Sequence, residues 1–63
     1  MNHFWCEIKF EDQDNVKTVI KKGFYCRQKD LEREVMMYVE RLREKNLFFR
    51  NLYFDGYEVI DIA

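Results

Sequence analysis

The sequence predicts a small α+β domain in which one amphipathic helix packs on one face of a β-sheet. Residues 4–10 alternate apolar and polar side chains, the period of two typical of a half-buried strand. Residues 31–42 repeat apolar side chains at helical spacing. Residues 47–63 are rich in aromatic and β-branched side chains, as strands are. A chain of 63 residues has room for one core, so we expect a single domain over residues 1–63.

The N-terminal half is expected to form a β-hairpin. The first strand holds Phe4, Cys6, Ile8 and Phe10 on its apolar face. The polar segment 11–15 suits a turn, and a second strand follows over about 16–25, with Gly23 as a candidate bulge. Pairing Phe10 with Val16 aligns the two apolar faces. This register also sets several other pairs, namely Cys6 with Ile20, Lys9 with Lys17, and Trp5 with Lys21.

The central segment is expected to be the helix. Asp30 is a suitable N-cap, and Glu32 and Glu34 follow it near the positive end of the helix dipole. Asn46 suits the position just after the helix. The stripe that faces the core consists of Leu31, Val35, Tyr38, Val39 and Leu42.

The C-terminal segment is expected to form a second hairpin. Asp55-Gly56 is a dipeptide favoured by two-residue type I′ turns, which predicts strands at about 48–54 and 57–62. The element order is then ββαββ, with a β-grasp-like sheet in the order 2-1-4-3 and a parallel pair between the first and last strands. The alternative is a three-stranded sheet in which residues 47–54 are irregular.

Composition and size favour binding over chemistry. Hydrophobic residues make up 48% of the chain and the net charge is −1, a globular rather than disordered balance. A core this small supplies only about 3–5 kcal/mol of net stability, so we expect no enzyme. No apolar run reaches the roughly 18 residues of a membrane span, and no signal peptide is recognisable. We therefore expect a cytoplasmic protein with free thiols at Cys6 and Cys26.

Catalytic and cofactor-binding motifs are not found in the sequence. The chain has one histidine and no serine, which rules out a Ser-His-Asp triad. Two cysteines and one histidine do not make a tetrahedral metal site, and two isolated glycines do not make a phosphate loop. The acidic turn at 11–14 lacks the EF-hand spacing. We expect no metal and no cofactor.

The sequence contains more apolar surface than one helix can cover. The expected core also takes in Val16, Ile20 and Phe24, with Ile60 and Ile62 from the last strand. Soluble monomers seldom expose an apolar patch beyond about 300–600 Å² unless it is functional. The opposite sheet face is left with Trp5, Val19, Tyr25, Tyr57 and Val59, and with either Phe48, Leu52 and Phe54 or Phe49 and Tyr53. A wrapped segment or sheet twist is the alternative way to hide this face.

The same face is expected to carry a basic edge. Residues 16–29 hold five Lys or Arg residues and no acidic residue. Lysines interleaved with aromatic rings on a sheet can bind single-stranded nucleic acid. However, a pI of about 5.8 lies far below the basic footprint usual for such proteins. An acidic protein partner fits the same pattern.

The leading functional hypothesis is a non-enzymatic protein–protein interaction module, a small inhibitor or antitoxin-like regulator that blocks a larger protein. Its bias toward residues with A/T-rich codons would suit a phage or mobile-element origin. The alternatives are a single-stranded nucleic-acid-binding domain that uses the same face, and a structural homodimer. The predicted partner-binding residues are Trp5, Tyr25, Tyr57 and Arg50, with Lys17 and Lys21 at the rim.

Overall fold

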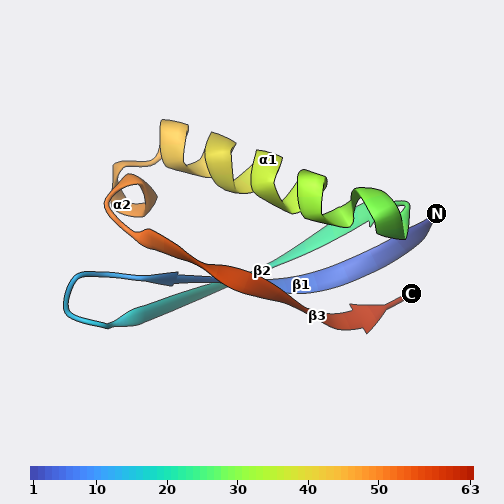
Figure 1. The fold of residues 1–63 in the computed structure, drawn as a ribbon, viewed down its shortest axis with the longest axis horizontal. Coiled ribbons are helices and arrows are strands. Elements are labelled where there is room, and N and C mark those ends of the chain that lie inside the picture. The colour runs from blue at the N-terminus through green and yellow to red at the C-terminus, as the bar shows by residue number, and fades with distance from the viewer.

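The computed structural model describes residues 1–63 as three antiparallel strands and one long helix, which confirms the small α+β domain. The sheet has the order β2-β1-β3, and α1 lies across one of its faces (Figure 1). A single 3-10 turn (Gln28–Asp30) precedes α1. The elements are β1 (Asn2–Glu11), β2 (Lys17–Cys26), α1 (Leu31–Lys45), the short α2 (Leu47–Arg50) and β3 (Tyr53–Ile62).

The first hairpin forms as expected, but its register differs from the predicted one by two residues. Phe10 pairs with Thr18 rather than with Val16. The turn explains the shift: the Asp12 carboxylate accepts hydrogen bonds from the backbone N–H groups of Asp14 and Val16 at 2.8 and 2.9 Å, and Asn15 adopts a φ of 63°. Val16 therefore belongs to the turn and is exposed. A shift of two residues keeps every β2 side chain on its expected face.

The helix begins and ends where the sequence predicts. Asp30 is the N-cap residue of α1, although its carboxylate makes no capping hydrogen bond and lies 3.7 Å from Arg33 instead. Asn46 follows α1, and its side-chain oxygen accepts a hydrogen bond from the Phe48 N–H, which caps α2. The expected stripe faces the sheet: Leu31, Val35 and Val39 are buried, and Tyr38 and Leu42 are half-buried against the same core.

The predicted second hairpin is wrong. Residues 53–62 form one strand, β3, which runs antiparallel to β1, so the four-stranded order and the parallel pair are also wrong. Gly56 has a φ of 100° and lies at a bulge, because Ile8 pairs with Tyr57 while Phe10 pairs with Phe54. Glycine at positive φ suits a bulge as well as a type I′ turn. The structure is closer to the three-stranded alternative, with residues 47–50 helical.

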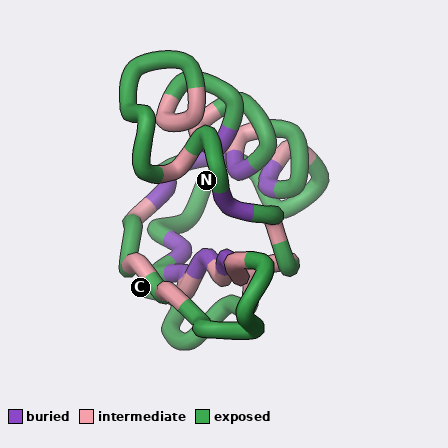
Figure 2. Tube along the Cα trace, turned by 90° about the vertical axis from the view of Figure 1, so that its left-hand side faces the viewer, coloured by how far each residue is buried: buried purple, intermediate pink, exposed green.

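The core lies between α1 and the sheet (Figure 2). Leu52 joins this core, although the sequence left its orientation open, whereas Ile60 and Ile62 were predicted to be buried and are exposed. The ten buried residues are Phe4, Cys6, Ile8, Phe10, Phe24, Cys26, Leu31, Val35, Val39 and Leu52.

The helix crosses the sheet on a diagonal, which decides what it covers. One 3-10 turn links β2 to α1, so the helix starts close to the end of β2. At its other end, α2 and Leu52 lead into the start of β3, and the Phe49 ring packs 5.0 Å from the Phe10 ring. The second half of β3 runs away from the helix (Figure 1). This geometry leaves Ile60 and Ile62 uncovered.

The two cysteines are free and buried, which confirms the prediction of free thiols. Cys6 pairs with Lys22 rather than with Ile20. Cys26 is therefore four residues farther along β2, a gap of about 13 Å at strand spacing, beyond the reach of a disulfide. No helix of the protein combines the length and the apolar character that crossing a bilayer requires.

Candidate interaction surface

The face of the sheet opposite α1 is not covered by another layer (Figure 1). We call it the outer face. Because side chains alternate along a strand, its residues are those between the buried positions. It is formed by His3, Trp5, Glu7, Lys9 and Glu11 from β1, Lys17, Val19, Lys21 and Tyr25 from β2, and Tyr53, Glu58 and Asp61 from β3.

The indole ring of Trp5 lies across the neighbouring strand, on Gly23. The two residues are paired in the β1–β2 ladder. A Cβ atom added at Gly23 would lie 3.0 Å from Cζ3 of the ring, which is too close for an unchanged ring position. The predicted bulge at Gly23 is wrong, because the β1–β2 pairing runs without interruption. This glycine instead leaves room for the Trp5 ring, which remains 47% exposed.

A shallow concavity surrounds the Trp5 ring. The rings of His3 and Tyr25 pack at 4.8 Å on one side of it, and Tyr25 is 61% exposed. The concavity measures about 360 Å³ and is lined by His3, Trp5, Lys21, Lys22, Gly23 and Tyr25. Three aromatic rings with a lysine border give a surface that is apolar at its centre and positively charged at its edge.

The charges on the outer face are arranged by strand. Lys21 lies opposite Glu7, and Glu7 lies opposite Glu58 on β3. The predicted pairs of Lys21 with Trp5 and of Lys9 with Lys17 are wrong, because of the two-residue shift in register. The β2 side of the outer face is therefore basic and the β3 side acidic. The only ion pairs in the structure join Arg33 to Asp30 and Glu34, away from this face.

The structure brings together four of the six predicted partner-binding residues. Trp5, Tyr25 and Lys21 line one concavity. Lys17 shares the outer face but lies at the turn end, opposite Glu11. The remaining two predicted residues, Tyr57 and Arg50, lie elsewhere.

Tyr57 was expected on the outer face but faces α1, because the bulge at Gly56 reverses the alternation along β3. It pairs with Ile8, whose side chain is fully buried. Burial raises the pKa of the Tyr57 phenol, and the neighbouring carboxylate of Glu32 on α1 raises it further. Tyr57 therefore lies on the helix side of the sheet and is not part of the outer face.

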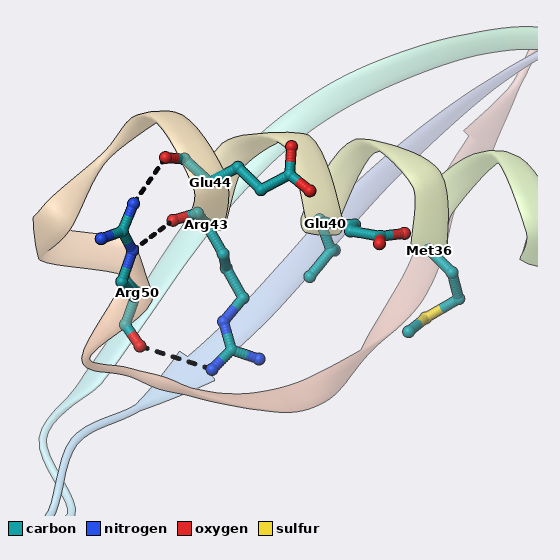
Figure 3. A pocket seen from close by; sticks show the side chains of 6 residues that line it. Met36, Glu40, Arg43, Glu44 and Arg50 are labelled. Atoms are coloured by element: carbon teal, nitrogen blue, oxygen red, sulfur yellow. Dashed lines mark hydrogen bonds between the residues drawn. The ribbon is translucent and has the colours of Figure 1, made fainter.

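Arg50 donates hydrogen bonds to the end of α1 and lies outside the outer face. Its Nε donates to the Arg43 carbonyl at 3.2 Å, and its Nη2 donates to the Glu44 carbonyl at 2.6 Å (Figure 3). Both carbonyls belong to the last turn of α1, where free acceptors and the negative end of the dipole favour a cation. This role explains why an arginine stands in α2, and it removes Arg50 from the predicted surface.

Sequence reasoning missed several members of this surface. It kept two alternatives for residues 47–54, and neither holds as a set, because α2 interrupts the strand-like alternation. Phe49 and Leu52 turn inward while Phe48 and Tyr53 are exposed. His3 is not among the predicted binding residues, although its parity with Trp5 in β1 places it on the outer face, where it lines the concavity.

The thiols and the acidic turn offer little chemistry. Burial raises the pKa of both cysteine thiols, and Glu34 and Asp30 raise that of Cys26 further, so both thiols are held in the unreactive protonated form. The turn carboxylate of Asp12 is occupied by two backbone N–H groups. No group of three or more His, Cys, Asp or Glu residues lies close enough to hold a metal ion.

Comparisons with protein-family models, with curated proteins and with solved structures found no match for this chain.

Proposed function

We propose that the protein is a non-enzymatic module that binds a larger protein through the outer face of its sheet, as an inhibitor or antitoxin-like regulator. The observation that carries this proposal is the Trp5 ring, held on Gly23 and half exposed beside Tyr25. Tryptophan and tyrosine are the residues most enriched in interface hot spots. A half-exposed tryptophan at the centre of an uncovered sheet is where such a hot spot is expected.

The ring is also positioned to bind at low entropic cost. It is anchored on β1, the central strand, and its position is restricted by the strand backbone at Gly23. A side chain that is already ordered loses little freedom on binding. Lys21 and Lys17 at the β2 side favour a partner with acidic groups at the matching edge, since complementary charges speed association and select the partner. Binding alone would then block the working surface of the larger protein.

The test compares Trp5→Ala with Phe48→Ala. Both remove an exposed aromatic ring, but Phe48 lies on α2, outside the outer face. A partner captured from the source cells with the wild-type protein is purified, and the dissociation constant of each variant is measured by calorimetry. Trp5→Ala should weaken binding at least about tenfold, a typical hot-spot loss, with an unchanged far-ultraviolet circular dichroism spectrum, and Phe48→Ala should bind normally. Equal weakening by both variants, or loss of the fold in Trp5→Ala, would refute the proposal.

Single-stranded nucleic acid is the second candidate for the same face. The grouping of His3, Trp5 and Tyr25 beside Lys21 favours it, because bases stack on such rings. Glu7, Glu58 and Asp61 on the same face oppose it. Binding to an oligonucleotide that weakens steeply with added salt would support this candidate over a protein partner. A mass that rises with protein concentration alone would instead indicate a homodimer.

A further inference from the structure

A second uncovered apolar surface lies on the opposite side of the sheet, beside the helix. Tyr57, Val59 and Ile62 pair with the buried residues of β1 and so point to the side of α1. At this end of the sheet α1 lies beside β2, so the helix does not cover these side chains. Val59 is 37% exposed and Ile62 is 58% exposed. On the facing flank of α1, Met36 is also exposed. Val59, Ile62 and Met36 are thus exposed apolar side chains beside the half-buried Tyr57, and we call these four residues the apolar patch.

The largest concavity of the molecule, about 600 Å³, lies along α1 and α2 and shares Met36 with the apolar patch. Glu40 and Glu44 also line this concavity (Figure 3). Its two arginines are already engaged, because Arg43 donates to the Arg50 carbonyl and Arg50 donates to two carbonyls of α1. Neither glutamate forms an ion pair. The part of α1 next to Met36 therefore has acidic groups that lack a cationic partner.

The edge of β3 adds both hydrogen-bonding groups and charge. β3 has a neighbouring strand on one side only, and the alternate backbone N–H and C=O groups of an edge strand point away from the sheet. Shifts in register against β1 flank residues 57–59 and leave that stretch regular. On the outer face, β3 has Glu58 and Asp61, which form no ion pair either.

We propose that this edge and the apolar patch bind an extended segment of another protein, in which apolar residues alternate with lysine or arginine. The segment would add a fourth strand beside β3, as in β-strand augmentation. Its apolar side chains would pack on Val59 and Ile62, on the side of the sheet that faces α1. Its basic side chains, on the opposite face of the new strand, would reach Glu58 and Asp61. This inference does not depend on the role of Trp5, which lies on the other face.

A second copy of this chain does not fit the same edge. Antiparallel pairing of β3 with β3 of another copy would set the acidic residues Glu58 and Asp61 of both copies near one another, and like charges across strands are destabilising. Pairing of β3 with the basic edge of β2 from another copy is heterologous and would give a ring or an open filament of many copies rather than a dimer. Charge and symmetry therefore favour a different protein that supplies one basic strand.

The probe is a synthetic eight-residue peptide of alternating lysine and valine, and its matched control has glutamate in place of lysine. Each is titrated into the ¹⁵N-labelled protein, and amide chemical shifts are followed. The lysine peptide should shift residues 57–62 and Met36 and leave Trp5 and Tyr25 unmoved. The absence of any shift at about 1 mM peptide would overturn the proposal, because a specific contact of this size should have a dissociation constant below that concentration. Equal binding of the glutamate peptide would overturn it as well.

Variants assign the contacts and separate this surface from the outer face. Ile62→Ser and Glu58→Lys should each weaken binding of the lysine peptide at least about fivefold, the loss expected for a contact residue. Their controls are Val19→Ser, an apolar position on the outer face, and Asp14→Lys, a charge change in the distant turn. Both controls and Trp5→Ala should bind the peptide normally. Loss of binding in Trp5→Ala, or equal loss in Asp14→Lys, would show that the peptide binds elsewhere or through net charge alone.

Discussion

The two edge strands of the sheet have similar lengths but opposite surroundings. One row of paired residues shows the difference: Phe4 at the centre is 2% exposed, Phe24 on β2 is 8% exposed, and Ile62 on β3 is 58% exposed. All three side chains point to the same side of the sheet. The helix covers the β2 end of this row and leaves the β3 end open.

The difference comes from the connections rather than from the strands. A single 3-10 turn holds the start of α1 to the end of β2, whereas α2 and Leu52 hold the end of α1 to the start of β3. The charges differ in parallel, since the outer face of β2 has Lys17 and Lys21 and that of β3 has Glu58 and Asp61. The apolar side chains at the β2 edge are thus buried under the helix, whereas those at the end of β3 are exposed to solvent.

The largest expected effect tests this comparison directly by truncating both ends of the row. Phe24→Ala should lower the free energy of unfolding by about 3–5 kcal/mol, the usual cost for a buried phenylalanine. Ile62→Ala should lower it by less than about 1 kcal/mol, because exposed positions contribute little. Urea denaturation followed by circular dichroism measures both. Since Phe24→Ala can exhaust the stability of so small a domain, Phe24→Leu provides a milder second variant, and similar losses at both strands would break the comparison.

Substitution of the two glycines should give the next largest effect, and each edge strand has one of them. Gly56 on β3 has a φ of 100°, so Gly56→Ala should cost about 1–2 kcal/mol from backbone strain alone. A Cβ atom added at Gly23 on β2 would meet only the Trp5 ring. Gly23→Ala should change stability by less than about 1 kcal/mol, because alanine suits a strand interior better than glycine.

The same two variants should differ in their tryptophan fluorescence. Trp5 is the only tryptophan, so its fluorescence reports on the outer face alone. Gly23→Ala should shift the emission of the displaced ring, whereas Gly56→Ala should leave the emission of the folded protein unchanged. An unchanged spectrum in Gly23→Ala would mean that the ring does not rest on this glycine.

The helix and the first hairpin could be predicted because their patterns are local and repeated. The stripe from Leu31 to Leu42 has the helical period, and the alternation in residues 4–10 has the period of a strand. The register of the hairpin could not be predicted, because both registers place the same side chains inward. The side-chain hydrogen bonds of Asp12 separate them, and these depend on the folded turn.

The C-terminal third shows where sequence patterns become ambiguous. Asp55-Gly56 suits a hairpin turn and a bulge equally, and the choice depends on whether β1 is available for pairing along the whole of β3. The candidate surface was predicted in its central part, Trp5 with Tyr25 and Lys21. Tyr57 and Arg50 were misplaced because one depends on the parity change at the bulge and the other on the position of a helix end.

The smallest expected effect concerns two weak acids on the two flanks of α1, the buried thiol of Cys26 and the half-buried phenol of Tyr57. Burial raises the pKa of the Cys26 thiol on β2 and of the Tyr57 phenol on β3; Glu34 adds to the first and Glu32 to the second. The folded state thus retains protons that the unfolded state releases, so stability should decline as pH rises above about 8.5 for the thiol and about 10 for the phenol. Burial also raises the pKa of the Cys6 thiol, so Cys26→Ala should make the first decline in the pH profile of the urea midpoint smaller, and the double variant Cys6→Ala/Cys26→Ala should remove it, whatever the effect on absolute stability. Glu34→Gln should lower the pKa of the Cys26 thiol, measured from thiolate absorbance, and leave that of Tyr57 unchanged. A Cys26 thiol that titrates at its usual pH in the native protein would show that the β2 side of the core is open to water.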